Sequence, residues 1–285
     1  MFFSKPDYHS RTCPARAGFS LIELSVVLVI VSIVAVMGLE LIANYMNRTA
    51  YKVTTERLDV IDSAMVAYRR VNNKLPCPAP EAVTATSACF GKELNGSGGA
   101  GTCNDIAGTC TASSTSGGSI VYGNVPVRDL GLPISAMYDG YGQRFYYVVT
   151  RDQTYTSTFN ATLDAIAVRS GKLDDDCTSG SALCQARGNA AYFLFSTGVD
   201  KRGSRNSSGN IARLCQDISS PTDVQLTDGM ADTMNCRLGD AMNFVKNGST
   251  PIAVPDHVYY DSRYNMGTTD NHFDDLVKWR SKGSL

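Results

Sequence analysis

The feature that most constrains this chain is an apolar run of about 21 residues, 19–39, that holds one charged side chain, Glu23. A helix of that length is about 30 Å long at ~1.5 Å per residue, so it matches the hydrocarbon core of a bilayer. An ionised carboxylate is costly in hydrocarbon and is expected there only with a partner. No basic residue lies inside the run, so the partner of Glu23 has to come from outside it.

Helical periodicity continues beyond this run. Residues at steps of three and four form one stripe of an amphipathic helix: Tyr51, Thr54, Leu58, Ile61, Met65 and Tyr68. The opposite face carries Lys52, Glu56, Arg57, Asp59, Arg69 and Arg70. The pattern predicts one helix from about residue 21 to residue 71, ended by Pro76, because proline disfavours a helical residue before it. Its second half must bury the stripe against a globular head.

Short runs rich in Val, Ile, Tyr and Phe predict the strands of that head at residues 119–122, 144–149, 163–168 and 191–196. The tail at 273–279 is expected to add a short strand or a turn. Residues 77–118 are rich in Gly, Ser, Thr and Ala and are expected to form a long surface loop. Residues 169–189 are a polar insert, and residues 206–255 are again polar. The predicted fold class is α+β, with a long N-terminal helix packed on an antiparallel β-sheet head.

The segment Gly18-Phe19-Ser20-Leu21-Ile22-Glu23 resembles the N-terminal signature of type IV pilins and type II secretion pseudopilins. The resemblance implies that a prepilin peptidase cuts between Gly18 and Phe19, that the new Phe19 amine is methylated, and that Glu23 pairs with that amine on a neighbouring subunit. From the residues alone, the alternative is an ordinary signal anchor with a chance glutamate.

Two stretches of the head support the resemblance. One is Tyr138-Asp139-Gly140-Tyr141-Gly142-Gln143-Arg144-Phe145, which is similar to a turn and strand of major pseudopilins. The other is Phe195-Ser196-Thr197-Gly198-Val199-Asp200, which is similar to a strand and Gly-Asp loop later in such heads. The implied organisation is a cleaved leader at 1–18, a membrane and assembly helix at 19–43, an amphipathic helix at 44–74 and a globular head at 75–285.

Cleavage would also change the cysteine count. Nine cysteines are present, and the leader holds Cys13. The other eight are disulfide candidates in an oxidising compartment: Cys77, Cys89, Cys103, Cys110, Cys177, Cys184, Cys215 and Cys236. Local pairings of Cys77 with Cys89 and of Cys103 with Cys110 are two guesses among roughly 105 connectivities. Reduced or metal-binding cysteines are the alternative.

Calcium is the one cofactor that the residues suggest. Asp174, Asp175 and Asp176 are candidate ligands, since calcium takes carboxylate oxygens. Major pseudopilins carry a calcium site in their late loops, and this resemblance implies that Asp200 is the better-placed candidate. A solvated acidic turn is the alternative for the three consecutive aspartates. No zinc or nucleophile motif is present, so no enzymatic activity is expected.

The function expected from these observations is that of a pilin-like structural subunit, minor or specialised, of a type IV pilus or a type II secretion pseudopilus. Its partners would be other pilin or pseudopilin subunits, the prepilin peptidase and an inner-membrane assembly platform. It would cross the inner membrane once with its head in the periplasm, or be extracellular in a pilus. The alternative is a pilus-displayed binding module, an adhesin or a DNA-uptake pilin. The net charge of −1 argues against nucleic acid.

Overall fold

The computed structural model describes residues 20–81, 83–94, 110, 113–114, 120–161, 163–170, 185–212, 223–225, 243–245, 252–253, 258–261 and 275–285. The chain divides into two compact units, Met1–Met46 and Asn47–Leu285, and each is described by itself. The second unit contains the β-sheets and the second part of the long helix.

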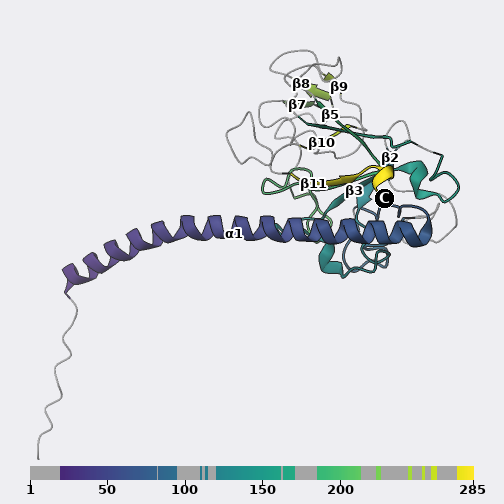
Figure 1. The fold of residues 1–285 in the computed structure, drawn as a ribbon. Coiled ribbons are helices and arrows are strands. Elements are labelled where there is room, and N and C mark those ends of the chain that lie inside the picture. Colours follow the sequence, from purple (N-terminus) through teal and green to yellow (C-terminus); the bar gives the residue numbers. More distant parts are fainter. Residues whose placement is uncertain are drawn as a thin grey trace, which may run out of the picture. The chain divides into compact units, whose positions relative to one another are not determined.

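Helix α1, Leu21–Asn72, confirms the predicted long helix to within one residue at its C-terminal end (Figure 1). Asn73 follows in the left-handed region at φ 53°, and its N–H donates to the carbonyl of Arg69. Left-handed residues commonly end helices because they turn the chain away from the axis. Among the helices that the structure describes, none is both long enough and apolar enough to cross a membrane.

The main sheet has five strands in the order β1 (Ser113–Ser114), β2 (Ile120–Asn124), β3 (Tyr146–Thr150), β6 (Tyr192–Ser196) and β11 (Leu276–Arg280). Every pairing in it is antiparallel. The predicted strands at 119–122, 144–149 and 191–196 correspond to β2, β3 and β6, and the tail forms β11. These pairings confirm the predicted antiparallel sheet.

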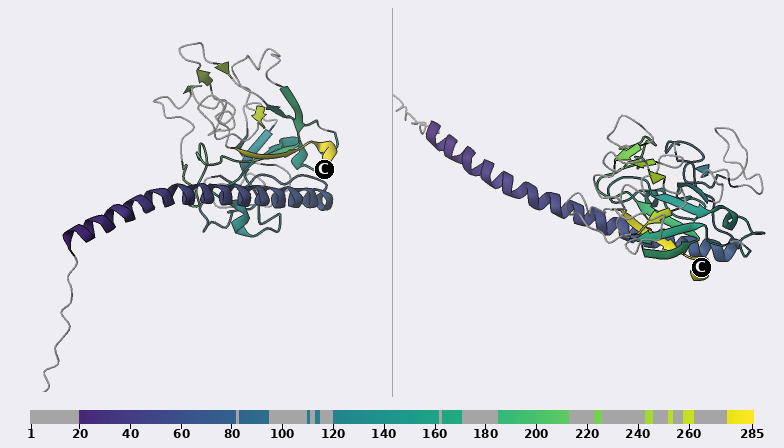
Figure 2. Two further views of the ribbon diagram at one scale, coloured as in Figure 1. Left: turned by 60° about the vertical axis from the view of Figure 1, so that its left-hand side comes forward. Right: turned by 90° about the horizontal axis from the view of Figure 1, so that it is seen from above.

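One face of the main sheet packs on the second part of α1, as the views of Figure 2 show. Leu58, Ile61 and Met65 of the helix are at most 3% exposed and join Tyr147 and Leu194 of the sheet in one core. Thr54 is also fully buried. From Thr54 to Met65 the predicted stripe is therefore the helix face that the head covers, whereas Tyr51 at its start is 38% exposed.

The other face of the main sheet packs on a second sheet, which was not predicted as a separate layer. The predicted strand at 163–168 overlaps β4 of this second sheet and does not belong to the main sheet. This sheet has the order β10 (Val258–Tyr260), β4 (Ile166–Ser170) and β5 (Gln185–Ala190), and β10 pairs with β4 in parallel. Phe193 of the main sheet lies 5.1 Å from Tyr259, between ring centroids. The C-terminal end of the polar insert at 169–189, for which no strand was predicted, forms most of β5 and pairs with β4.

The remaining elements are short. A third sheet joins β7 (Asp223–Gln225), β8 (Asn243–Val245) and β9 (Ile252–Ala253) within the polar region at 206–255. Short 3₁₀ helices are η1 (Ile134–Met137), η2 (Arg151–Thr154) and η4 (Lys282–Ser284). The larger elements of unit Asn47–Leu285 form three successive layers: the second part of α1, the main sheet and the second sheet. One hydrophobic core lies on each face of the main sheet.

Candidate functional site

The first turn of α1 carries the predicted assembly residue. Ser20 begins the helix: its hydroxyl accepts from the N–H of Ile22, and its carbonyl accepts from the N–H of Leu24 at 3.1 Å. Glu23 lies in the first turn with an exposed side chain, where a carboxylate interacts favourably with the positive end of the helix dipole. Gly18 and Phe19, the predicted cleavage and methylation residues, lie outside the described residues.

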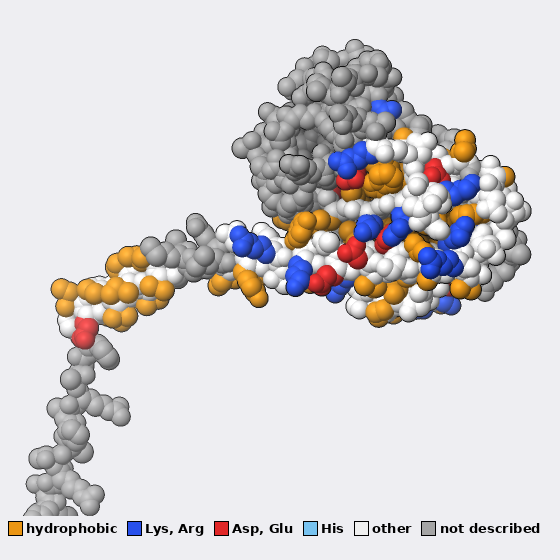
Figure 3. Space-filling model, viewed as in Figure 1, with side chains coloured by type: hydrophobic (Ala, Val, Ile, Leu, Met, Phe, Trp, Pro, Cys, Tyr) orange, Lys and Arg blue, Asp and Glu red, His pale blue; other side chains and the backbone are white. Residues whose placement is uncertain are grey.

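Apolar side chains around Glu23 are exposed on every side of the helix. Figure 3 shows them gathered over the first part of α1. From Leu21 to Val34, the large aliphatic side chains that the structure describes are between 50% and 88% exposed. A soluble monomer rarely exposes a contiguous apolar surface of this extent, so the surface indicates contact with lipid or with other protein chains.

The two head motifs meet at one buried carboxylate, that of Asp139. Its Oδ1 accepts from the N–H groups of Tyr141 and Gln143 at 2.9 and 2.7 Å, and its Oδ2 accepts from the Ser196 hydroxyl at 2.6 Å. Burial raises the pKa of Asp139, and the bonds from Ser196, Gln143 and Tyr141 oppose that rise. The turn at 138–144 is thus fixed to the end of β6, 57 residues later in the chain.

The same turn is docked on α1. The N–H of Gly140 donates to the hydroxyl of Thr54 at 2.8 Å, and Arg57 donates to the carbonyls of Tyr138 and Asp139. A Cβ on Gly140 would lie 2.1 Å from the carbonyl oxygen of Ala50, which is backbone. Only glycine fits this contact, so the motif glycine sets how closely the head approaches the helix.

A second contact between helix and sheet centres on Asp62, which the sequence reading did not single out. Asp62 is 3% exposed. Its Oδ1 accepts from the Tyr192 hydroxyl at 2.6 Å and from Arg280 Nε at 2.8 Å, and its Oδ2 accepts from Arg280 Nη2 at 2.6 Å. Burial alone would raise the pKa of Asp62, but the bonds from Arg280 and Tyr192 outweigh it and lower the pKa below its usual value.

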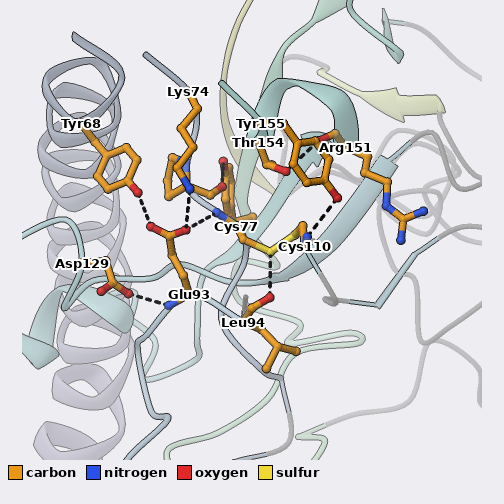
Figure 4. The surroundings of a disulfide bond; sticks show 12 residues. Tyr68, Lys74, Cys77, Glu93, Leu94, Cys110, Asp129, Arg151, Thr154 and Tyr155 are labelled. Carbon is orange, nitrogen blue, oxygen red and sulfur yellow. Dashed lines mark hydrogen bonds and ion pairs between the residues drawn. A yellow bond between two sulfur atoms is a disulfide. The ribbon is translucent and has the colours of Figure 1, made fainter. Parts of the chain in front are cut away.

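The segment that follows α1 is held by a disulfide and a buried carboxylate (Figure 4). Cys77 is bonded to Cys110, with Cα atoms 5.6 Å apart. Beside it, Glu93 accepts from the Tyr68 hydroxyl and from the N–H of Cys77, and it lies 3.8 Å from Lys74 Nζ. This network joins the last turns of α1 to the loop region of the head.

The disulfide corrects the two local pairings suggested by spacing. Because Cys77 pairs with Cys110, the pairings Cys77–Cys89 and Cys103–Cys110 are both wrong. Cys89 is also disulfide-bonded. The other candidates lie outside the described residues: Cys103, Cys177, Cys184, Cys215 and Cys236.

The best-placed calcium candidate, Asp200, is engaged by a cation of the chain itself. Its Oδ1 accepts from the N–H of Arg202 at 2.8 Å, and its Oδ2 lies 2.7 Å from Arg202 Nε. Among the described residues, no three His, Cys, Asp or Glu side chains are gathered as a metal site would require. Asp174, Asp175 and Asp176 fall outside those residues, so calcium binding stays a prediction.

Comparison with known proteins identified a family motif at the N-terminus. The family described as Prokaryotic N-terminal methylation motif matches residues 13–39. Searches of curated proteins and of solved structures found no match. The matched residues include Gly18, Phe19 and Glu23, together with the apolar first part of α1. The chain therefore carries the prepilin cleavage and methylation motif that is typical of type IV pilins and type II pseudopilins.

Proposed function

We propose that this chain is the precursor of a structural subunit of a type IV pilus or a type II secretion pseudopilus. The observation that carries the proposal is the coincidence of two features. The methylation motif covers residues 13–39, and the same residues begin a 52-residue helix whose first part is apolar and exposed all round. In this proposal, Phe19 becomes the mature N-terminus after the peptidase cuts behind Gly18, and its amine is methylated.

The physical role of α1 follows from its two parts. The apolar part is stable in lipid before assembly and among identical helices afterwards, since both surroundings are apolar. The second part is bound to the head by hydrogen bonds of Thr54, Arg57 and Asp62. A subunit of this kind can leave the membrane when the helices of its neighbours replace the lipid around it.

Glu23 has a specific role in this proposal. A carboxylate among apolar helices is costly alone and acceptable when it is paired with a cation. The freed amine of Phe19 on the adjacent subunit is the cation that the motif supplies. Pairing at this one position would fix the axial register of one subunit against the next.

The proposed cell biology follows from the motif. The precursor is inserted in the inner membrane, the head lies in the periplasm, and an assembly platform polymerises the mature chain with other pilins. The described residues of the head form three β-sheets and a disulfide-linked loop region, which supports a minor or specialised subunit. The proposed role is structural and involves no catalysis.

The proposal is tested at Glu23. We expect Glu23→Val to be inserted and cleaved normally but to enter filaments at a share reduced on the order of tenfold or more, because a lost pairing of ~1.4 kcal/mol already gives that factor. Filaments sheared from the cells and membrane fractions are compared by immunoblot in a strain that makes the partner subunits.

Ser32→Val is the matched control. Ser32 lies on the same apolar part of α1, and its hydroxyl donates to the carbonyls of Leu28 and Val29 within the helix. Its loss should leave filament incorporation unchanged. Equal incorporation of Glu23→Val and wild type would reject the register role of Glu23. Absence of the wild-type chain from filaments of its own system would reject the subunit role.

A further inference from the structure

Calcium is the cation that the resemblance to major pseudopilins implies for the loop after β6, so the groups of that loop decide whether calcium fits there. The loop spans 197–206, and its one acidic residue is Asp200. Three basic residues accompany it: Lys201, Arg202 and Arg205. Calcium sites gather several carboxylate and carbonyl oxygens, and three positive charges beside one negative charge oppose the approach of a divalent cation.

The carboxylate of Asp200 already holds a cation of the chain. Asp200 Oδ1 accepts from the N–H of Arg202 at 2.8 Å, and Asp200 Oδ2 lies 2.7 Å from Arg202 Nε. The Asp200 side chain is 14% exposed and the Arg202 side chain 19%, so water screens this ion pair less than a fully exposed one. Calcium at Asp200 would have to displace the guanidinium and leave it largely buried without its counterion, which is costly.

Neighbouring oxygens are engaged as well. The carbonyl of Lys201 accepts from the N–H and from the hydroxyl of Ser204, at 3.2 and 2.7 Å. The hydroxyl of Ser196, where β6 ends, donates to Asp139 and accepts from the N–H of Gly198 at 3.2 Å. These oxygens already bind donors or acceptors of the chain, so the groups around Asp200 do not fit a calcium ion.

The contact between Asp200 and Arg202 encloses a strained residue. Lys201, which lies between them in the chain, has φ 60°, in the left-handed region that residues with a Cβ rarely adopt. Such a conformation costs free energy and persists only where the surrounding contacts hold it. The ion pair therefore closes the turn at the residue that most needs to be held in place.

This turn positions two carbonyl groups that bind the rest of the head. The carbonyl of Gly203 accepts from the Tyr146 hydroxyl at 2.7 Å. The carbonyl of Arg205 accepts from the N–H of Arg144 at 2.9 Å. Both acceptors follow Arg202 within three residues, so the conformation at Lys201 sets where they lie.

We propose that Arg202 takes the place of calcium in this loop. Its guanidinium neutralises Asp200 and holds Lys201 in the left-handed conformation, so the loop keeps its structure without a bound metal. The calcium site that the resemblance implies at Asp200 is thus replaced by a cation that belongs to the chain.

The test is hydrogen exchange of the full-length protein in detergent, followed by mass spectrometry of the peptide that covers 197–206. Exchange is measured with the chelator EGTA and with about 10 mM calcium, a concentration tenfold above the weakest dissociation constants of extracellular calcium modules. We expect the wild-type loop to exchange at the same rate in both solutions. Because the readout is confined to this loop, calcium bound elsewhere in the chain is not mistaken for binding at Asp200.

Arg202→Gln removes the cation, and Arg187→Gln is the matched control. Arg187 of β5 forms an ion pair with Asp261, and its side chain is 46% exposed. Arg202→Gln should raise the exchange rate of the loop about fivefold or more, because its ion pair is little exposed and closes the turn. Arg187→Gln should leave that rate within about twofold. Unchanged exchange of β3 shows that each variant is folded.

Asp200→Asn separates the ion pair from other effects of Arg202. If the two side chains act as one pair, the double variant should exchange no faster than the faster single variant. Slower exchange of the wild-type loop in calcium than in EGTA would overturn the proposal, and this comparison requires no variant. Equal effects of Arg202→Gln and Arg187→Gln, or additive effects of Asp200→Asn and Arg202→Gln, would overturn it as well.

Discussion

Removing the Asp62 carboxylate should destabilise the head far more than removing its neighbour Asp59. Both residues lie on α1 and pair with cations of β11, but the two pairs differ in burial. The Asp62 side chain is 4% exposed and binds Arg280 through two oxygens. The Asp59 side chain is 58% exposed and lies 2.8 Å from Lys278 through one oxygen.

The expected magnitudes follow from these contacts. The pair with Arg280 is discounted because the Arg280 side chain is 34% exposed, and we assign it ~1–2 kcal/mol. Asp62→Ala also leaves the hydroxyl of Tyr192, a residue with 0% exposure, without its acceptor, which costs ~1–3 kcal/mol. The sum is about 2–5 kcal/mol for Asp62→Ala, against ~0–1 kcal/mol for Asp59→Ala.

The assay is urea unfolding of the full-length protein in detergent, monitored by near-ultraviolet circular dichroism of the head. It should be repeated at several values of pH, because the pKa of Asp62 is lowered below 3.8 by folding. Its contribution is present in full above pH 3.8 and is lost as the pH falls through the lower pKa of the folded state. The Asp62→Ala variant lacks this component, so its stability should fall less steeply than that of wild type in this acidic window.

Two results would contradict a special contribution of the buried Asp62 carboxylate. The first is an equal loss of unfolding free energy in the Asp62→Ala and Asp59→Ala variants. The second is an identical acid dependence of wild type and Asp62→Ala below pH 3.8. Either would show that the bidentate contact between helix and last strand contributes no more than an exposed ion pair.

The remaining predictions concern the packing of the helix on the head and the covalent link. Gly140→Ala places a Cβ 2.1 Å from the Ala50 carbonyl and should cost on the order of 3 kcal/mol in the same urea assay. Gly283→Ala, where a Cβ meets nothing within 4 Å, should leave stability unchanged, and equal effects of the two substitutions would contradict the close contact. The link between Cys77 and Cys110 closes a sequence separation of 33 residues, so selective reduction should cost ~3–4 kcal/mol if chain entropy dominates. Non-reducing peptide mapping should recover these two cysteines in one linked fragment, and recovery of Cys77 linked to Cys89 would contradict the assignment.

The helix could be predicted from the sequence because its signals are local. The stripe from Thr54 to Met65 repeats at the helical period, and the Leu75-Pro76 step stops it. The strands β2, β3 and β6 could be predicted from the sequence as well, since each contains a short run of β-branched or aromatic residues. These elements fixed the α+β class and the layer formed by helix and main sheet.

The second sheet could not be predicted as a separate layer, although the predicted strand at 163–168 overlaps its strand β4. Strand β5 reads Gln-Ala-Arg-Gly-Asn-Ala and lacks an apolar alternation, so only its pairing with β4 makes it a strand. A signal for a layer beyond the main sheet was nevertheless present. In β3 and β6 every residue is buried, and an uninterrupted apolar run is typical of strands covered on both faces.

The contacts that fix the head to the helix depend on distant parts of the chain. Asp62 pairs with Arg280 at a separation of 218 residues, and no local pattern distinguishes it from the solvated carboxylate of Asp59. Resemblance to pseudopilins pointed to the stretches around Asp139 and Ser196, but not to their hydrogen bond. Disulfide connectivity is likewise set by the folded chain, which is why both pairings suggested by short spacing were wrong.

The measurement that tests the account most directly is the mass of the N-terminal peptide of this protein purified from cells with and without prepilin peptidase. With the peptidase, the peptide should begin at Phe19 and carry a methyl group on its amine. Without the peptidase, the peptide should retain residues 1–18. A mature protein that keeps these residues in cells with an active peptidase would contradict the account.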